Sequence, residues 1–130
     1  MIKAVIFDFD QVIVNSYIDH LVAFSIAAQK FGIKINPRQI YIRFGKSAKD
    51  ILHELKPEIS DEVIKKFIDD KEKIYRGYAA EKGFKLMPGT KELLKFLKNK
   101  KIKCAIASSA SRRNISLAVK KTGIKKYFSA

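Results

Sequence analysis

The sequence predicts an α/β fold in which a parallel sheet core, incomplete at its C-terminal end, carries an inserted all-helical segment. Two short runs, 2–7 and 102–107, are apolar except for Lys3 and Lys103 and contain β-branched residues. Such runs are typical of parallel strands that are buried on both faces. The residues between them repeat at helical spacing, and two strands alone do not make a stable sheet. We therefore expect a helical insertion into a sheet that needs further strands.

The insertion contains several helices with identifiable ends. In the first helix, apolar side chains such as Ile18 and Ile26 recur every three or four residues until Gly32 ends the pattern. The later helices each begin at a residue type that caps helix N-termini, namely Asn36 (before Pro37), Ser47 and Ser60. The predicted helices cover 16–31, 36–44, 47–55 and 60–80.

The chain is expected to return to the sheet core after Pro88-Gly89, which breaks the helical pattern. A helix over 91–98 leads into the second strand, and a last helix is capped by Ser111 and closed by Gly123. Residues 124–130 are expected to be a plain connection. The predicted domains are a core made of 1–15 and 85–130 and a helical cap made of 16–84.

The chain is strongly basic, which brings anionic partners into consideration. It has 27 Lys and Arg against 13 Asp and Glu in 130 residues, a formal net charge of +14. The lysines are spread over several predicted helices, and neither zinc-finger spacing nor an aromatic RNA-binding motif accompanies them. We expect a basic surface that attracts small phosphorylated molecules, and we consider nucleic acid the less favoured partner.

The cysteine content and the hydropathy pattern indicate a soluble, cytoplasmic protein without a membrane partner. Cys104 lies among apolar residues, so a buried side chain is favoured over a reactive thiol. A single cysteine forms no intramolecular disulfide, which suits a reducing compartment. The chain opens without a leader pattern, and no apolar stretch reaches the about 20 residues that cross a bilayer.

Two carboxylates follow the first predicted strand at a spacing that suits phosphate chemistry. Asp8 and Asp10 are two residues apart, so on an extended chain they project to the same side. They lie where open α/β sheets place their ligands. Like charges this close favour a bound cation or unequal protonation, which suits a nucleophile beside an acid or base. The alternative is that both are strand-end turn residues or part of a surface ion pair.

The run 5–16, VIFDFDQVIVNS, resembles the first motif of the haloacid dehalogenase superfamily, an apolar strand followed by Asp-x-Asp-Gly-[Thr or Val]-[Leu or Ile] and then Asp-[Ser or Thr]. The resemblance implies that Asp8 is the nucleophile that becomes phosphorylated and that binds Mg²⁺ through its side chain. It implies that Asp10 is the general acid and base and gives its backbone carbonyl to the metal. The fold implied is Rossmann-like.

The motif departs from the family pattern at two positions. Gln11 stands where the family usually has Gly, and Asn15 stands where it usually has Asp. The first departure matters more, because that Gly helps the chain to turn tightly after the aspartates. We expect Gln11 to strain the turn or to crowd the site.

A second match lies at the end of the second predicted strand. The run 101–109, KIKCAIASS, resembles the second motif of the family, a strand that ends in Ser or Thr. The resemblance implies that the Ser108 hydroxyl holds a phosphate oxygen, with the backbone amide of Ser109 nearby. Ser108 taken alone is equally explained as a turn or cap residue. Arg112 is a candidate for drawing in a substrate anion, against the simpler role of a solvated helix charge.

The helical insertion resembles the cap of the subgroup that contains β-phosphoglucomutase and phosphoglycolate phosphatase. The run 44–52, FGKSAKDIL, is similar to the cap loop that faces the substrate in that subgroup. The resemblance implies that Lys46, Ser47 and Lys49 set specificity, although helix-start chemistry also explains them. His20 lies where the mutase branch carries a histidine.

The resemblance implies a Mg²⁺-dependent phosphohydrolase that acts on a small phosphorylated metabolite through an aspartyl-phosphate. The family's third strand, a lysine and an acidic pair that completes the metal site lie beyond the position that matches residue 130, so the chain is expected to be truncated at its C-terminus. Two alternatives stay open. One is a phosphotransferase of the β-phosphoglucomutase type, and the other is an inactive or split chain that assembles, through an exposed sheet edge, with copies of itself or with a C-terminal partner chain.

Overall fold

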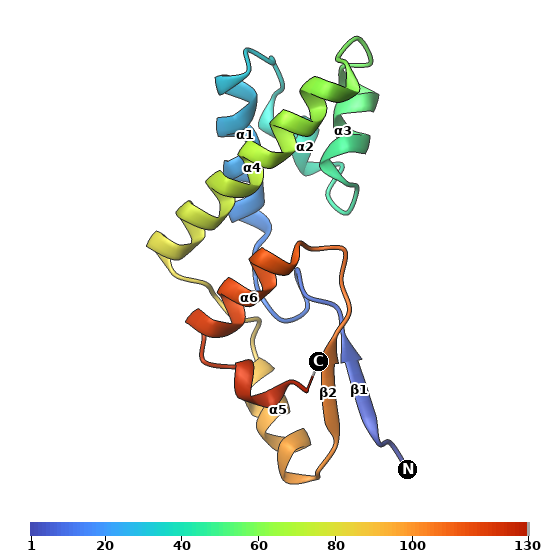
Figure 1. The fold of residues 1–130 in the computed structure, drawn as a ribbon, viewed down its shortest axis with the longest axis vertical. Coiled ribbons are helices and arrows are strands. Elements are labelled where there is room, and N and C mark those ends of the chain that lie inside the picture. Colours follow the sequence, from blue (N-terminus) through green and yellow to red (C-terminus); the bar gives the residue numbers. More distant parts are fainter. Residues whose placement is uncertain (130) are drawn as a thin grey trace. The chain divides into compact units, whose positions relative to one another are not determined.

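The computed structural model describes residues 1–129, and Ala130, the last residue of the expected core, lies outside the described residues. Two strands are separated along the chain by a series of helices (Figure 1). The elements are, in chain order, β1 (Ala4–Phe7), α1 (Tyr17–Lys30), α2 (Pro37–Tyr41), α3 (Ala48–Leu55), α4 (Asp61–Lys82), α5 (Thr90–Asn99), β2 (Lys103–Ile106), α6 (Arg112–Lys121) and the short 3-10 helix η1 (Lys125–Tyr127).

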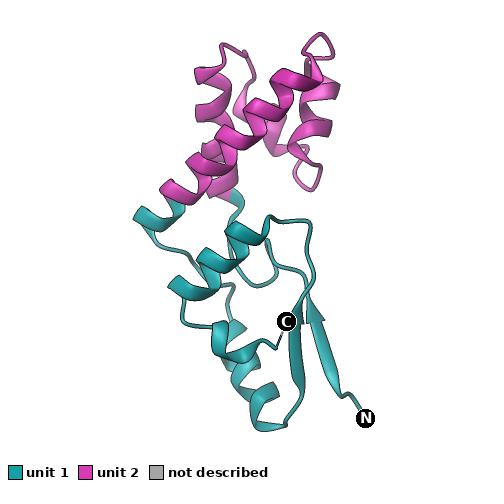
Figure 2. Cartoon of the chain, viewed as in Figure 1, with its two compact units in different colours: residues 1–17, 79–130 teal, residues 18–78 magenta. Residues whose placement is uncertain are grey.

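The chain forms two compact units, which Figure 2 shows in separate colours. Unit 1 comprises residues 1–17 and 79–130, and unit 2 comprises residues 18–78. Both strands belong to unit 1, and the regular elements of unit 2 are all helices. Each unit has its own cluster of buried apolar side chains.

The two strands of unit 1 are parallel neighbours, as the sequence predicts. β1 pairs with β2 in a register that joins Ala4 to Lys103 and Phe7 to Ile106. The ladder continues past the strand ends, since the Ala107 amide donates to the Phe7 carbonyl at 2.9 Å. The α/β fold, with a short parallel sheet and a largely helical chain, is therefore confirmed.

The core of unit 1 forms where α5 and α6 meet the strands (Figure 1). Helix α5 contributes Leu94 and Leu97, which lie three residues apart on one face of the helix. Cys104 of β2 is buried in the same cluster, and burial raises the pKa of its thiol. The prediction of a buried cysteine is confirmed. From α6 the cluster takes Ala118 and Val119, and from the loop that follows it takes Ile124.

The prediction that β1 is buried on both faces is wrong for the described chain. Exposed and half-buried residues alternate along the strand, and Ile6 keeps 70% of its surface exposed. Val5 and Phe7, on the other face, pack against the core of unit 1. Since side chains alternate across a strand, one face of β1 is covered and the other is open.

In the helical part of the chain the predicted N-caps are confirmed. The Asn36 side chain accepts a hydrogen bond from the Arg38 amide at 2.8 Å, and Gln39 completes a reciprocal capping box. Ser47 accepts from the Asp50 amide at 3.1 Å, in front of α3. Caps of this kind stabilise a helix by about 0.5–2 kcal/mol each.

The buried face of α1 differs from the predicted one. Ile18 and Ile26 are 52% and 43% exposed. The side chains that α1 buries in the core of unit 2 are Phe24 and the small residues Ala27 and Ala28. Alanines on the buried face let neighbouring side chains approach closely, so hydrophobicity alone predicted the wrong face. Phe24 and Phe31 both pack edge-on against Phe67 of α4, at 5.0 and 5.5 Å between ring centroids.

Residues 13–15, which lead into the helical insertion, pair inside unit 1 with residues 85–87, which lead out of it. The Asn15 amide donates to the Lys85 carbonyl at 2.8 Å, and the Met87 amide donates to the Ile13 carbonyl at 2.8 Å. Thr90, at the start of α5, also donates its hydroxyl to the Ile13 carbonyl. These bonds hold the chain that follows the aspartates against the start of α5.

Residues 125–129 are structured and bonded to the core, whereas the sequence predicts a plain connection there. Residues 125–127 form η1, and the Ser129 amide then donates to the Cys104 carbonyl of β2 at 2.9 Å. Phe128 meets Phe7 edge-on, with 6.3 Å between ring centroids. The chain is thus extended beside β2 where the description ends.

No helix in residues 1–129 combines the length and the hydropathy that a membrane span requires.

The packing of α5 predicts losses of stability of very different size for truncation of two adjacent leucines. Leu94→Ala should lower the free energy of unfolding by about 2–5 kcal/mol, because Leu94 is 1% exposed and truncation leaves a cavity. Leu93→Ala is the matched control, since Leu93 is 45% exposed and its loss should cost less than about 1 kcal/mol. Urea unfolding followed by circular dichroism measures both. Equal stabilities of the two variants would contradict the packing described.

Candidate active site

Asp8 is the first residue after β1, at the carboxyl edge of the strand pair. Its side chain is exposed, and its Oδ1 accepts a hydrogen bond from the Phe9 amide at 2.6 Å. Phe7 is in register with Ile106, so the residues that follow β1 lie beside those that follow β2. This edge is where open α/β sheets bind ligands.

Asp10 lies in a tight turn built around the carbonyl of Phe9. The amides of Val12, Ile13 and Val14 all point at that carbonyl, at 2.9–3.3 Å. The half-buried Asp10 carboxylate accepts a hydrogen bond at Oδ1 from the hydroxyl of Ser16, at 2.7 Å. Ser16 is itself 2% exposed. The hydrogen bond from this buried hydroxyl fixes the direction of the Asp10 carboxylate.

Gln11 adopts the left-handed conformation that the family's glycine would adopt without strain. Its φ is 61°, a region that costs a residue with a Cβ about 1–2 kcal/mol. Its side chain offsets this cost, since Oε1 accepts hydrogen bonds from the amides of Ser16 and Tyr17 at 2.8 and 3.0 Å. These amides open α1, so Gln11 caps that helix from across the turn.

The serine candidates lie in the turn between β2 and α6. Ser108 is half-buried, and its Oγ accepts from the Ala110 amide at 3.1 Å, which is the local role of a turn serine. The same oxygen retains its hydrogen as a donor. Ser109 is exposed. Arg112 is the exposed first residue of α6, which Ser111 caps through the Asn114 amide.

The carboxylates of this edge offer part of the ligand set that Mg²⁺ requires. Mg²⁺ takes near-octahedral coordination by oxygen, commonly from one or two carboxylates with waters and substrate phosphate. Asp8 and Asp10 are oxygen donors of the right type. Residues 1–129 contain no group of three or more His, Cys, Asp or Glu side chains arranged to hold a metal. The oxygen donors of Asp8 and Asp10 therefore fit part of a Mg²⁺ site.

In unit 2, the candidates of the cap loop have local partners. Lys46 donates to Glu54 at 2.7 Å, and Arg43 donates to the other oxygen of the same carboxylate at 3.0 Å. The hydrogen bond from Lys46, followed by that from Arg43, lowers the pKa of Glu54. Ser47 caps α3, and Lys49 is an exposed residue in the first turn of that helix.

His20, also in unit 2, belongs to an interaction between α1 and α4. Its ring stacks on Tyr75, with 4.0 Å between centroids and an angle of 3° between planes. Its Nδ1 lies 3.0 Å from Nζ of Lys71, whose side chain is 9% exposed and also donates to Glu72 at 3.0 Å. An ammonium group is only a donor, so Nδ1 of His20 is the acceptor in this contact.

The structure thus divides the predicted residues into two groups. Asp8, Asp10, Ser108, Ser109 and Arg112 belong to unit 1 and follow its two strands, whereas His20, Lys46, Ser47 and Lys49 belong to unit 2.

Two contacts of the site escaped the sequence analysis. These are the hydroxyl of Ser16 on Asp10 and the carboxamide of Gln11 on the start of α1. A polar residue in place of an expected glycine, six residues before the first residue of α1, was the signal for the second.

The double role of Gln11 predicts different stabilities for two small replacements. Gln11→Ala keeps the left-handed backbone cost and loses the helix cap, so it should lower the free energy of unfolding by about 1–2 kcal/mol. Gln11→Gly also loses the cap but removes the backbone cost, and should stay within about 1 kcal/mol of the native chain. Thermal and urea unfolding measure this. An alanine variant as stable as the native chain would show that the carboxamide contributes nothing.

Comparison with known proteins identifies relatives that share the sequence pattern and the fold of this chain. A sequence model of the haloacid dehalogenase-like hydrolase family matches residues 5–130. A HAD hydrolase of family IA, variant 3, from Entamoeba histolytica superposes with a TM-score of 0.83 at 26% identity, over 98% of this chain and 58% of that one.

Two other solved structures share the fold at lower identity. A candidate phosphoglycolate phosphatase from Lactobacillus plantarum has a TM-score of 0.84 at 18% identity, covering 100% of this chain and 60% of that one. CbbY from Rhodobacter sphaeroides, in complex with xylulose-(1,5)bisphosphate, has a TM-score of 0.82 at 19% identity, with 98% and 61% covered. The chain spans about three fifths of the length of these proteins. The match over residues 5–130 shows that the chain belongs to the haloacid dehalogenase-like hydrolase family.

Proposed function

We propose that Asp8 is the nucleophile, and Asp10 the general acid and base, of a Mg²⁺-dependent phosphohydrolase that acts on a small phosphorylated metabolite. The observation that carries this proposal is the shared edge of β1 and β2, where Asp8 and Ser108 follow strands whose last residues are paired. Membership of a hydrolase family whose structural neighbours include phosphatases supports the same reaction class. A cytoplasmic location is part of the proposal, since the chain has a single, buried cysteine.

In the proposed reaction, an oxygen of the Asp8 carboxylate attacks the phosphorus of the substrate. The bond from phosphorus to the leaving oxygen breaks, and Asp10 gives that oxygen a proton, so that an alcohol departs and Asp8 carries the phosphoryl group. Asp10 then takes a proton from a water molecule as that water attacks the phosphorus. The bond between phosphorus and the Asp8 oxygen breaks, which restores the carboxylate and releases inorganic phosphate.

Other residues of unit 1 have defined parts in the proposal. The Ser108 hydroxyl and the Ser109 amide donate hydrogen bonds to a phosphate oxygen, and exposed Arg112 attracts the anion. Ser16 orients Asp10 through the 2.7 Å hydrogen bond. A Mg²⁺ ion held by Asp8 and Asp10 would neutralise part of the phosphate charge.

Specificity is assigned in the proposal to the cap loop of unit 2. Lys46, Ser47 and Lys49 are all exposed there. Lys46 would have to exchange its ion pair with Glu54 for a substrate phosphate, and water around this exposed pair weakens the interaction that has to be given up.

The first test is hydrolysis of an aryl phosphate by the purified chain. Turnover should require Mg²⁺ and should fall at least about 10³-fold in Asp8→Asn, because an amide is not a nucleophile at phosphorus. Asp69→Asn, an exposed aspartate of α4, is the matched control and should keep full activity.

Undiminished turnover in Asp8→Asn would refute the mechanism. No turnover from a folded native chain would contradict activity of these 130 residues. That result would favour the alternative in which β1, which pairs only with β2 in the described residues, pairs its other edge with another chain.

A phosphotransferase of the β-phosphoglucomutase type is the second candidate, and it is favoured by the ordered environment of His20. His20→Gln keeps a hydrogen-bond acceptor near Lys71 but removes the imidazole. If the reaction transfers a phosphoryl group between two positions of a sugar, this variant should isomerise β-glucose 1-phosphate at least about tenfold more slowly than the native chain. Its rate of aryl phosphate hydrolysis should be unchanged. A coupled assay for glucose 6-phosphate measures this. No isomerisation by the native chain would exclude the mutase.

A further inference from the structure

The positive charge of the chain is concentrated in unit 1. Residues 1–17 and 79–130 contain 15 Lys and Arg but four Asp and Glu, whereas residues 18–78 contain 12 and nine. Unit 2 therefore has nearly enough carboxylates to balance its cations, and its ion pairs include Lys30 with Asp70 and Lys46 with Glu54. Unit 1 has a large excess of cations, which the even spacing of lysines along the sequence conceals.

All of this excess lies in one segment, residues 91–126, because cations and carboxylates are equal in number in the rest of unit 1. Glu92 is its single carboxylate, so the segment cannot balance its own charge. Its twelve cationic residues are all exposed: Lys91, Lys95, Lys98, Lys100, Lys101, Lys103, Arg112, Arg113, Lys120, Lys121, Lys125 and Lys126.

Part of this charge forms a stripe along α5. Lys91, Lys95 and Lys98 are spaced by four and three residues, which places them on one face of the helix. Like charges at this spacing destabilise an isolated helix. An anion bound along the stripe would relieve that repulsion.

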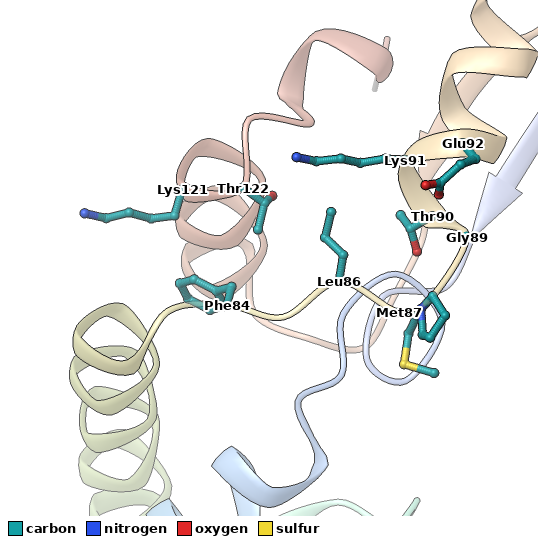
Figure 3. Close-up of a pocket in the computed structure, with 10 residues that line it drawn as sticks. Phe84, Leu86, Met87, Gly89, Thr90, Lys91, Glu92, Lys121 and Thr122 are labelled. Atoms are coloured by element: carbon teal, nitrogen blue, oxygen red, sulfur yellow. The ribbon is translucent and has the colours of Figure 1, made fainter.

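The stripe continues onto the end of α6. Figure 3 shows Lys91 of α5 and Lys121 of α6 among the residues that line a hollow, together with Thr122 and the apolar side chains Phe84 and Leu86. The core of unit 1 holds these two helices together, since Leu94 and Ala118 are buried in the same cluster. Cations from two elements therefore border one hollow.

An aromatic ring lies among the cations at the other end of the stripe. The ammonium groups of Lys98 and Lys126 lie 5.5 and 5.4 Å from the ring centroid of Tyr127. We call the surface made by Lys91, Lys95, Lys98, Lys121 and Lys126 with the ring of Tyr127 the basic surface.

We propose that the basic surface binds single-stranded nucleic acid. Lysines neutralise successive phosphates of a strand, and exposed aromatic rings stack on unpaired bases, the combination used by proteins that bind single strands without sequence preference. The faces of bases in a duplex are covered by their neighbours, so the Tyr127 ring favours a single strand. The proposal is separate from the carboxylates, because no residue of the basic surface belongs to the proposed catalytic set.

An anionic membrane fits this surface less well. Binding in a bilayer interface requires an apolar face that enters the lipid. Among residues 91–126, all of which the structure describes, Leu93 and Phe96 are the exposed large apolar side chains. Two such side chains among twelve cations favour a hydrophilic polyanion.

Fluorescence anisotropy of a labelled 20-nucleotide strand, as RNA and as DNA of the same sequence, tests the proposal with the full chain. Both strands should bind, and the dissociation constant should rise with KCl with a log–log slope of roughly 3, as expected for about four phosphate contacts. A triple variant, Lys95→Glu with Lys98→Glu and Lys126→Glu, should weaken binding at least about 30-fold. Tyr127→Leu, which removes the ring but keeps an apolar side chain against the core, should weaken it at least about fivefold.

The matched control changes the same net charge on unit 2. Lys34→Glu with Lys65→Glu and Lys73→Glu replaces three exposed lysines and should weaken binding less than about threefold, since these lysines do not belong to the basic surface and would act only through the net charge, which salt screens. Circular dichroism confirms that each variant is folded.

Three results would overturn the proposal. The first is an equal loss of affinity in both triple variants, which would mean that net charge alone attracts the strand. The second is binding that is insensitive to salt, and the third is binding to a duplex or to phosphatidylserine vesicles that is as tight as binding to the single strand.

Discussion

The parallel pairing of β1 with β2 in a single register is the constraint on which the site of this protein depends. Some ninety residues separate the two strands in the chain, yet Phe7 lies beside Ile106, and Ala107 continues the ladder to Phe7. A slip of one residue would turn Val5 and Phe7 away from the core and move Asp8 to the other face. The cluster of Leu94, Cys104 and Ala118 thus maintains the geometry that phosphate chemistry would need.

The second constraint is the turn that follows β1. Three amides converge on the Phe9 carbonyl, Ser16 holds Asp10, and Gln11 holds the start of α1. The acid/base candidate and the first helix of the insertion are therefore fixed by the same few residues. A glycine at position 11 would allow this turn with less strain, but it would leave the first amides of α1 without the acceptor that the carboxamide supplies.

Much of this arrangement could be predicted from the sequence, because its signals are local. The strand runs, the caps Asn36, Ser47 and Ser111, and the Asp-x-Asp pair each depend on neighbours a few residues away. The errors arose where the answer depends on distant segments. α1 turns alanines rather than Ile18 and Ile26 to the core of unit 2, and β1 leaves Ile6 open because helices cover one of its faces. The same contrast holds for the functional residues. The motif, which is local, predicted Asp8. The capping role of Gln11 and the grouping of lysines from α5, α6 and η1 depend on how the chain folds and were visible only in the structure.

Covalent labelling of Asp8 tests the central claim of this account most directly. The chain would be incubated with Mg²⁺ and acetyl phosphate, quenched in acid, digested and analysed by mass spectrometry, with Asp8→Asn treated in parallel. The account predicts a phosphoryl group on Asp8, on the peptide that contains β1, and none on the corresponding peptide of the variant. A phosphoryl group on another residue, or turnover of the phosphate donor without any labelled Asp8, would contradict it.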